Sequence, residues 1–261
     1  MCELMAISSN ISVDPIFIFK KMRKHSSKGK NCDGWGIGFY KGKEAHIFKE
    51  PVASHDSKLA EKIENDNIKL RSKVFITHIR AATSGKNTLM NTHPFKREIL
   101  GTEWLFAHNG TVGKLEEKTK IFKIATKFKP KGQTDSEKAF CYILDKIKQV
   151  GNSEKNFKKK VRLFRQVFKQ IKKFGIFNAI LSDGKYLYCF GDSRLFYIEK
   201  ELKKRNPLFR NKEVKEGKNH LKHAIEKTII VSTRPLTTNP KDKWIKIKGL
   251  KVFRHGEVVV K

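Results

Sequence analysis

Hydrophobic residues occur in short runs before residue 110 and after residue 175, which favours β-strands in both regions. The runs have four to eight residues, are rich in β-branched and aromatic side chains, and are separated by glycines and polar turns. The predicted strands cover residues 2–7, 34–40, 45–49, 73–80, 104–108, 176–182, 185–190, 194–199, 228–232, 244–247, 250–254 and 257–260.

Helical spacing is clear in the middle of the chain. Thr134 and Glu137 have the spacing of a capping box, which indicates the start of a helix. After them, apolar residues recur three or four positions apart, at Phe140, Ile143, Leu144 and Ile147. A second helix is predicted over 154–174, with a phenylalanine-rich face and a basic face. Strands, then two helices, then strands indicate an α+β layered domain rather than a repeated β-α-β unit.

The composition fits a folded and strongly basic protein. With 38% hydrophobic residues and 19 phenylalanines, the 261-residue chain can fill a core. Its 57 Lys+Arg exceed its 26 Asp+Glu, which gives a formal net charge of +31. Residues 1–113 hold 18 basic and 11 acidic side chains, and residues 114–261 hold 39 and 15. The Lys-rich stretch 200–226 is expected to be a basic loop or insertion. The charge makes nucleic acid one partner to consider.

Several classes of protein are excluded by simple features. No run of about 18 apolar residues occurs, so no transmembrane helix is expected, and the acidic Glu3 argues against a secretory signal. The four cysteines, Cys2, Cys32, Cys141 and Cys189, form no CxxC pair. Neither a zinc ribbon nor a disulfide framework is therefore expected, and a reducing compartment fits best. We expect a cytoplasmic protein that does not contact membranes.

The position of Cys2 offers a nucleophile. Loss of Met1 would place a thiol and a free α-amine on one residue, and an α-amine with a pKa of about 7.7–8.0 is a usable base near neutral pH. A nucleophile served by an N-terminal amine is a known catalytic arrangement. Taken alone, Cys2 is better explained as a small side chain without a catalytic role.

Polar residues next to predicted strands and at the start of the first helix suggest groups that bind an amino acid. Arg80 could hold a carboxylate, or it could form an internal salt bridge with Asp or Glu. Asn109 and Gly110 could donate two N–H groups to an oxyanion, or they could form a hairpin turn. Asp135 could hold an ammonium group, or it could serve the first turn of the helix. For Arg80 and for the Asn109–Gly110 pair, the structural alternative is favoured in isolation.

Together, these features describe a pocket for an α-amino acid whose distal acyl group is attacked. Arg80 and Asp135 would hold the carboxylate and the ammonium group, Cys2 would attack, and Asn109 with Gly110 would stabilise the oxyanion. Glutamine and other γ-glutamyl compounds have this layout.

The chain resembles the class II glutamine amidotransferases, which are N-terminal nucleophile (Ntn) hydrolases. Six motifs carry the resemblance in matching order and spacing, with Cys at position 2. They are 1–4 (MCEL), 33–40 (DGWGIGFY), 78–83 (HIRAAT), 91–95 (NTHPF), 107–110 (AHNG) and 134–140 (TDSEKAF). Weaker matches at 177–184 and 232–236 extend it over nearly the whole chain except 200–226. The chain looks like the small stand-alone members of this family.

This resemblance implies a four-layer αββα sandwich of two antiparallel sheets, of the Ntn-hydrolase type, as a single domain over residues 1–261. It implies Cys2 as the nucleophile, its α-amine as the proton relay, and Asn109 with Gly110 as the oxyanion hole. The residues implied in substrate binding are Arg80, Thr83, Asp135, Trp35 and Gly36. No metal or organic cofactor is implied.

Two functions compete on the sequence. The preferred one is a glutamine amidotransferase or γ-glutamyl amide hydrolase that works through a γ-glutamyl thioester on a small-molecule substrate, with an acidic acceptor protein as a further partner. The alternative is a basic nucleic-acid-binding protein with a non-catalytic Ntn-like fold. It is less favoured because no RNA- or DNA-binding motif accompanies the charge, and because Phe157, Phe164 and Phe168 are spaced as a core face. His93 and His108 are expected to orient the site rather than to catalyse.

Overall fold

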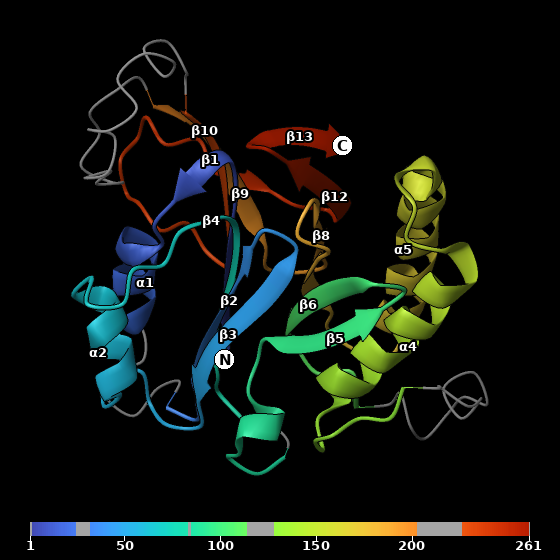
Figure 1. Cartoon of the computed structure of the whole chain (residues 1–261), viewed down its shortest axis with the longest axis horizontal. Helices are drawn as coiled ribbons and strands as arrows, with labels where there is room; N and C mark the ends of the chain where they lie inside the picture. The colour runs from blue at the N-terminus through green and yellow to red at the C-terminus, as the bar shows by residue number, and fades with distance from the viewer. Residues whose placement is uncertain (1, 25–31, 83–84, 114–127, 203–225, 261) are drawn as a thin grey trace.

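Two antiparallel β-sheets lie face to face, and α-helices cover the outer face of each sheet (Figure 1). The computed structural model describes residues 2–24, 32–82, 85–113, 128–202 and 226–260. One sheet has seven strands in the order β11-β9-β10-β1-β4-β2-β3, and the other has six in the order β13-β12-β8-β7-β6-β5. Helices α1 and α2 cover the first sheet, and α4 and α5 cover the second. The predicted α+β sandwich with layers in the order αββα is confirmed.

The elements have the following bounds. The seven-stranded sheet contains β1 (Glu3–Val13), β2 (Trp35–Lys41), β3 (Glu44–Glu50), β4 (Ser72–Ile79), β9 (Phe196–Leu202), β10 (Glu226–Ser232) and β11 (Ile245–Lys246). The six-stranded sheet contains β5 (Phe95–Ile99), β6 (Thr102–Asn109), β7 (Asn178–Ser182), β8 (Leu187–Gly191), β12 (Gly249–Arg254) and β13 (Glu257–Val260). The helices are α1 (Ile16–Arg23), α2 (Lys58–Glu64), α4 (Asp135–Val150) and α5 (Phe157–Lys172), with 3-10 turns η2 (Leu89–Asn91) and η4 (Glu154–Asn156).

Both faces of the central strands are buried, which explains the nearly continuous apolar runs in the sequence. In β1, Leu4 and Ala6 lie in the core between the two sheets, whereas Met5 and Ile7 lie in the core beneath α1 and α2. Neighbouring residues of a strand point to opposite faces, so a strand that is covered on both sides has no polar face. The first predicted strand is therefore apolar at every position from Leu4 to Ile7.

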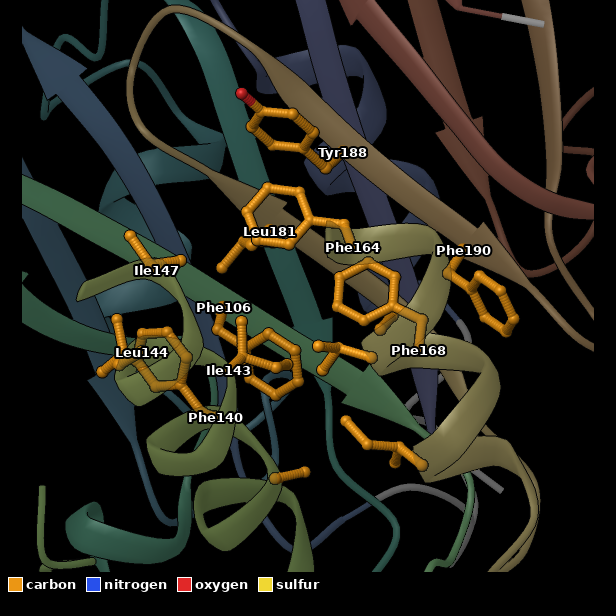
Figure 2. Close-up of a cluster of buried hydrophobic side chains, with 14 of the residues drawn as sticks. Phe106, Phe140, Ile143, Leu144, Ile147, Phe164, Phe168, Leu181, Tyr188 and Phe190 are labelled. Atoms are coloured by element: carbon orange, nitrogen blue, oxygen red, sulfur yellow. The ribbon is translucent and has the colours of Figure 1, made fainter. Parts of the chain in front are cut away.

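Helices α4 and α5 cover the six-stranded sheet through aromatic packing (Figure 2). Phe140 of α4 stacks on Phe106 of β6 with ring centroids 5.0 Å apart. Phe164 of α5 meets Tyr188 of β8 edge-on, with ring centroids 4.8 Å apart. Phe168 of the same helix stacks on Phe164. Fully burying one such side chain contributes about 1.5–3 kcal/mol to folding. The phenylalanine face predicted for the second helix is thus a core face.

Helix α4 begins at Asp135, as the spacing of Thr134 and Glu137 predicts. The Thr134 hydroxyl accepts a hydrogen bond from the backbone N–H of Glu137 at 3.2 Å. The Glu137 carboxylate accepts from the backbone N–H of Gly132 at 2.6 Å and pairs with Arg97. The hydroxyl cap predicted for this helix is therefore present, and the Glu137 side chain also fixes the loop before the helix.

The hydrophobic pattern does not predict α1, α2 or the edge strand β5. The two helices have eight and seven residues, which is too short for a clear helical repeat. In β5, charged residues at 96–98 hide the strand signal. The helix expected over 154–174 is shorter, because a 3-10 turn precedes Phe157 and α5 ends at Lys172. In the described part of the chain, no helix is long and apolar enough to cross a membrane.

The ends of the expected basic loop 200–226 belong to the seven-stranded sheet. Strand β9 continues to Leu202, strand β10 begins at Glu226, and these two residues pair with each other. The ladder hydrogen bonds of two antiparallel strands extend further than the local polarity suggests. Residues 203–225, which make up the rest of that loop, lie outside the described residues.

Candidate active site

Three strands of the seven-stranded sheet bring their flanking residues together at one end of the sheet. Glu3 in β1 and Trp35 in β2 both pair with Ile79 in β4. Cys2 and Arg80 directly adjoin these paired positions. The residue predicted as the nucleophile and the cation predicted to bind a carboxylate therefore lie at the same end of the sheet.

The two sheets are connected at this end by a hydrogen bond between Asn109 and Cys2. Nδ2 of Asn109 donates to the backbone carbonyl of Cys2 at 2.5 Å. The chain does not turn back at Asn109, because α4 and α5 come before β7, whose Asn178 pairs with Asn109. The hairpin alternative for Asn109 and Gly110 is therefore wrong, and the Asn109 amide points at the Cys2 residue.

The thiol of Cys2 is held by a single backbone unit. The residue is only partly exposed, and the N–H of Ala81 donates to its Sγ at 3.2 Å, while the thiol can donate to the Ala81 carbonyl at 3.2 Å. Burial raises the pKa of Cys2, and the Ala81 hydrogen bond and the positive charge of Arg80 act against this rise. These two groups favour the thiolate, which is the reactive form.

Arg80 is a buried cation beside Cys2. The residue is 3% exposed, and its guanidinium donates to Oδ1 of Asn87 at 2.6 Å and to the carbonyls of Gly85 at 3.1 Å and Asp33 at 3.3 Å. Burial lowers the pKa of Arg80, whereas the charge of Asp33 raises it. Gly85 and Asn87, which follow β4, and Asp33, which precedes β2, thus all contact the guanidinium.

Asp33 also binds Ala82 and Asn87 through its own side chain. Its carboxylate accepts from the N–H of Ala82 at 2.7 Å and from Nδ2 of Asn87 at 2.9 Å. Burial opposes the ionisation of Asp33, but these hydrogen bonds and the charge of Arg80 together lower its pKa. The acidic neighbour required by the salt-bridge alternative is therefore present, and carboxylate binding by Arg80 stays a prediction. Sequence reasoning misses Asp33 and Asn87, because 47 residues separate Asp33 from Arg80.

Gly110 and Asp135 shape the segment that follows β6. Gly110 has a φ of +141°, and a Cβ at this position would lie 2.0 Å from the carbonyl oxygen of Ile176, so a larger residue does not fit. Asp135 accepts from the backbone N–H groups of Val112 at 2.6 Å and Ser136 at 2.8 Å. Asp135 thereby ties the segment after Gly110 to the start of α4. Its predicted contact with an ammonium group stays a prediction.

Trp35 and Gly36 have packing roles at the start of β2. Trp35 is fully buried in the core beneath α1, where it meets Phe19 edge-on at 5.4 Å. A Cβ at Gly36 would lie 2.2 Å from the carbonyl oxygen of His93, so the close approach of these segments requires glycine. A substrate contact by either residue stays a prediction. Thr83 lies outside the described residues.

Three buried histidines lie next to the site. The rings of His78 and His93 are 4.3 Å apart, and their nitrogens make no hydrogen bond of good geometry within the described residues. In His108, Nδ1 lies 2.8 Å from Oγ of Ser136, and Nε2 lies 3.1 Å from the carbonyl of Ile176. Burial lowers the pKa of all three, that of His78 to about 3. Among the described residues, no group of three or more His, Cys, Asp or Glu side chains is arranged to hold a metal ion.

Asn178 is a further candidate that sequence reasoning misses. It is fully buried at the start of β7, and its Oδ1 accepts from the backbone N–H groups of Asp192, Ser193 and Arg194 at 3.1, 3.1 and 3.0 Å. Its Nδ2 lies 3.2 Å from the backbone oxygen of Asn109 and 3.3 Å from Oδ1 of Asn109. The signal in the sequence is one asparagine in an apolar strand, and its meaning depends on the pairing of β6 with β7.

The fold and the site together define an Ntn-type amidotransferase architecture: two facing antiparallel sheets between helices, with a cysteine before the first strand. The family model "Glutamine amidotransferases class-II" matches residues 1–261. The chain belongs to the class II glutamine amidotransferase family.

Individual relatives cover the whole chain. The "Putative glutamine amidotransferase YafJ" of Escherichia coli (strain K12) is 34% identical over 269 residues, covering 100% of both chains. A Haemophilus influenzae relative described as "Putative glutamine amidotransferase" is 32% identical, and the match covers 99% of this chain and 86% of the relative. The crystal structure of a "predicted glutamine amidotransferase" from Pseudomonas aeruginosa PA01 has a TM-score of 0.71 and 26% identity, with full coverage of both chains. Glutamine phosphoribosylpyrophosphate amidotransferase from B. subtilis shares the fold, with a TM-score of 0.62 at 14% identity over 98% of this chain and 48% of its own.

Proposed function

We propose that the protein hydrolyses γ-glutamyl amides with Cys2 as nucleophile and acts as the glutaminase of an amidotransfer reaction. The substrate is glutamine or another γ-glutamyl compound. The observation that carries this proposal is the 2.5 Å hydrogen bond from Nδ2 of Asn109 to the backbone carbonyl of Cys2. A neutral amide donor therefore lies next to the residue that bears the thiol. The oxyanion of a substrate attacked by this thiol would form close to that donor.

The first half of the reaction forms a thioester. Removal of Met1 leaves a free α-amine on Cys2, which takes the thiol proton, and the thiolate attacks the side-chain carbonyl carbon of the substrate. As the C–S bond forms, the carbonyl electron pair moves to oxygen, where Nδ2 of Asn109 and the backbone N–H of Gly110 hold the charge. The pair then returns, the C–N bond breaks, and the α-ammonium gives its proton to the departing ammonia or amine.

The second half releases the acid. The α-amine takes a proton from water as the water oxygen attacks the thioester carbon, and the same two donors hold the new oxyanion. When the C–S bond breaks, the sulfur leaves as the thiolate and takes up the proton from the α-ammonium. All of these steps use groups of Cys2, Asn109 and Gly110.

The substrate's α-amino acid end is assigned to Arg80, Asp135 and Thr83. Arg80 supports this assignment because it is a buried cation next to Cys2, and a carboxylate would replace a neutral acceptor such as Oδ1 of Asn87 by a charged one. A hydrogen bond with one ionised partner is already about twice as strong as a neutral one, and a bound carboxylate would make both partners charged.

We also propose an acidic protein, rather than nucleic acid, as the partner that receives the product. Helix α5 contains no acidic residue and exposes several cations. The exposed cations on this basic face are Lys158, Lys159, Arg162, Arg165, Lys169 and Lys172. Phe164 and Phe168, which could otherwise stack on bases, are fully buried in the core. The positive charge of α5 therefore favours a partner with a negatively charged surface. Because Phe164 and Phe168 cannot stack on bases, a protein is preferred over nucleic acid as that partner.

The test of the catalytic proposal is the substitution Cys2→Ala. We expect the purified wild-type protein to release glutamate from at least one of glutamine, glutathione and γ-glutamyl amines, and we expect Cys2→Ala to release none, because alanine has no nucleophile. Glutamate and ammonia are measured with coupled enzymes, and intact mass spectrometry is expected to show a mature chain that starts at Cys2.

The matched control is Cys32→Ala, which removes the other partly exposed thiol and should keep the wild-type rate. Undiminished turnover by Cys2→Ala would overturn the mechanism. A folded wild-type protein that is inactive on every γ-glutamyl compound would overturn the proposed function.

A further inference from the structure

We propose that Asn178 is a positioning residue that fixes the side-chain amide of Asn109 with its Nδ2 toward Cys2. The inference rests on the proposed function for the oxyanion role of Asn109. It goes beyond that function by naming the group that sets the direction of the amide, and hence whether the site presents a donor or an acceptor to the substrate.

An asparagine side-chain amide fits the same space in two orientations that differ by a 180° turn, because its two ends have nearly the same shape. The two orientations differ in their hydrogen bonding. One end has two N–H donors, and the other has an oxygen that only accepts. If Asn109 were turned by 180°, its oxygen would face Cys2 and would repel a developing oxyanion. Something near Asn109 must therefore select one of the two orientations.

The orientation of Asn178 is determined by the turn between β8 and β9. Three backbone N–H groups, from Asp192, Ser193 and Arg194, converge on one end of its amide at 3.0–3.1 Å. Only an oxygen can accept all three, so this end is Oδ1, and the NH₂ end must face the opposite way. Asn178 is fully buried, so water does not compete for these contacts.

The fixed NH₂ group of Asn178 then selects the orientation of Asn109. It lies 3.2 Å from the backbone oxygen of Asn109, 3.3 Å from Oγ of Ser193 and 3.3 Å from one end of the Asn109 amide. That end of the Asn109 amide is favoured as Oδ1, because an NH₂ group in its place would set two donors against each other. The other end of Asn109 is therefore Nδ2, and it donates to the Cys2 carbonyl at 2.5 Å. The Cys2 carbonyl is itself only an acceptor, so both neighbours of Asn109 require the same orientation.

The turn that determines the orientation is itself anchored. The Asp192 carboxylate pairs with Lys172 at the end of α5 at 2.5 Å and accepts from the backbone N–H of Phe177 at 3.3 Å. A continuous path of hydrogen bonds therefore runs from the β8–β9 turn through Asn178 and Asn109 to Cys2.

The substitution Asn178→Asp tests this path directly. The new carboxylate keeps the shape and one oxygen for the three N–H groups, which favours its ionised form. Its second oxygen faces Oδ1 of Asn109, so the Asn109 amide is expected to turn and to lose its donor toward Cys2. We expect kcat to fall about 10²–10³-fold, as for loss of one oxyanion donor, with KM near the wild-type value.

Two kinetic comparisons separate positioning from general damage. Asn10→Asp adds the same charge at the far end of β1, where Oδ1 of Asn10 accepts from the backbone N–H of Lys227 at 2.9 Å, and it should leave kcat unchanged. The double variant Asn109→Ala/Asn178→Asp should be no slower than Asn109→Ala alone, because one donor is lost only once. If the two losses multiply fully, the proposal is overturned.

A readout independent of turnover completes the test. In ¹⁵N-labelled protein, the Asn109 side-chain NH₂ resonances are identified by their disappearance in Asn109→Ala. In folded Asn178→Asp they should shift, because one N–H now donates to a carboxylate. Unshifted resonances would overturn the proposal whatever the activity. An inactive wild type would overturn the proposed function while this spectrum still decides the role of Asn178.

A second variant covers the case in which Asn178→Asp does not fold. In Asn178→Ser the hydroxyl can either donate or accept, so it no longer imposes one orientation on Asn109. We expect an Asn109 resonance shift and a loss of kcat of about tenfold or more, which is a smaller effect than that of a reversed amide. Wild-type kcat together with wild-type resonances in this variant would overturn the proposal.

Discussion

Buried imidazoles make the stability of this protein sensitive to acid. His78 is fully buried, and burial lowers its pKa to about 3, compared with about 6.5 in an unfolded chain. Its neutral form is therefore favoured by folding. This contribution to stability is complete above pH 6.5 and is lost as the pH falls toward 3. Burial lowers the pKa of His93 as well, so His93 acts in the same direction.

We expect the free energy of unfolding of the wild type to fall more steeply below pH 6.5 than that of His78→Phe. One histidine of this kind contributes a slope of up to about 1.4 kcal/mol per pH unit between the two pKa values. Urea unfolding between pH 7 and pH 4 measures the slope. Equal slopes in wild type and His78→Phe would contradict this assignment.

A site residue can be predicted when its neighbours in the sequence identify it. It cannot be predicted when its role depends on contact with a residue far away in the sequence. Cys2 is identified by its position after Met1, and Asn109 and Gly110 by their place after an apolar strand. Asn178 gains its meaning only when β7 pairs with β6, and a single sequence does not state that register. For the same reason, the hydrogen bonds that join Asp33 to Arg80 and Ala82 can be recognised only in the folded chain.

At the scale of elements, the start of α4 depends on one hydroxyl. Thr134 caps the helix that also presents Asp135, and its hydroxyl accepts from the backbone N–H of Glu137. We expect Thr134→Ala to lower stability by about 1 kcal/mol, because one buried N–H loses its acceptor. For a chain of this size the melting temperature should fall by roughly 2–4 °C. Calorimetry measures the shift.

The variant Thr134→Ser is the matched comparison, since it keeps the hydroxyl and removes only a methyl group. It should melt close to the wild type. A melting temperature of Thr134→Ala equal to that of Thr134→Ser would show that the cap contributes little to the stability of α4.

The elements that the sequence predicts well are those whose whole length is buried or strongly amphipathic. Strands β4 and β6 and helices α4 and α5 are of this kind, and their burial follows the apolar pattern. The elements that it misses lie at the margins: β5 is an edge strand with charges, and α1 and α2 are each about two turns long. Their structure comes from docking on the seven-stranded sheet or pairing with β6, which local sequence does not describe.

At the scale of the whole molecule, the charge of +31 is separate from the proposed chemistry. The residues at the strand ends, Cys2, Arg80 and Asn109, lie within residues 1–113, where basic side chains exceed acidic ones only moderately. The larger excess lies in the rest of the chain, including the basic face of α5. Electrostatic attraction alone gives binding to nucleic acid that is independent of sequence and falls steeply with salt.

We therefore expect duplex RNA or DNA to bind at about 50 mM salt and to be released by about 200 mM salt. Fluorescence anisotropy of labelled duplexes measures this binding. Lys158→Gln/Lys159→Gln should weaken the low-salt binding and leave γ-glutamyl hydrolysis unchanged. Tight binding that persists above 200 mM salt would instead favour the alternative of a nucleic-acid-binding protein.

The hydrogen bond between Asn109 and Cys2 has a consequence for how the proposed reaction uses binding energy. In the resting protein, the Asn109 donor already has an acceptor, the neutral carbonyl of Cys2. A bound amide substrate offers another neutral acceptor, so exchanging one for the other changes the free energy little. The tetrahedral oxyanion offers a charged acceptor, which forms a stronger bond. The exchange becomes favourable only as the barrier is crossed, so this donor discriminates between the bound substrate and the transition state.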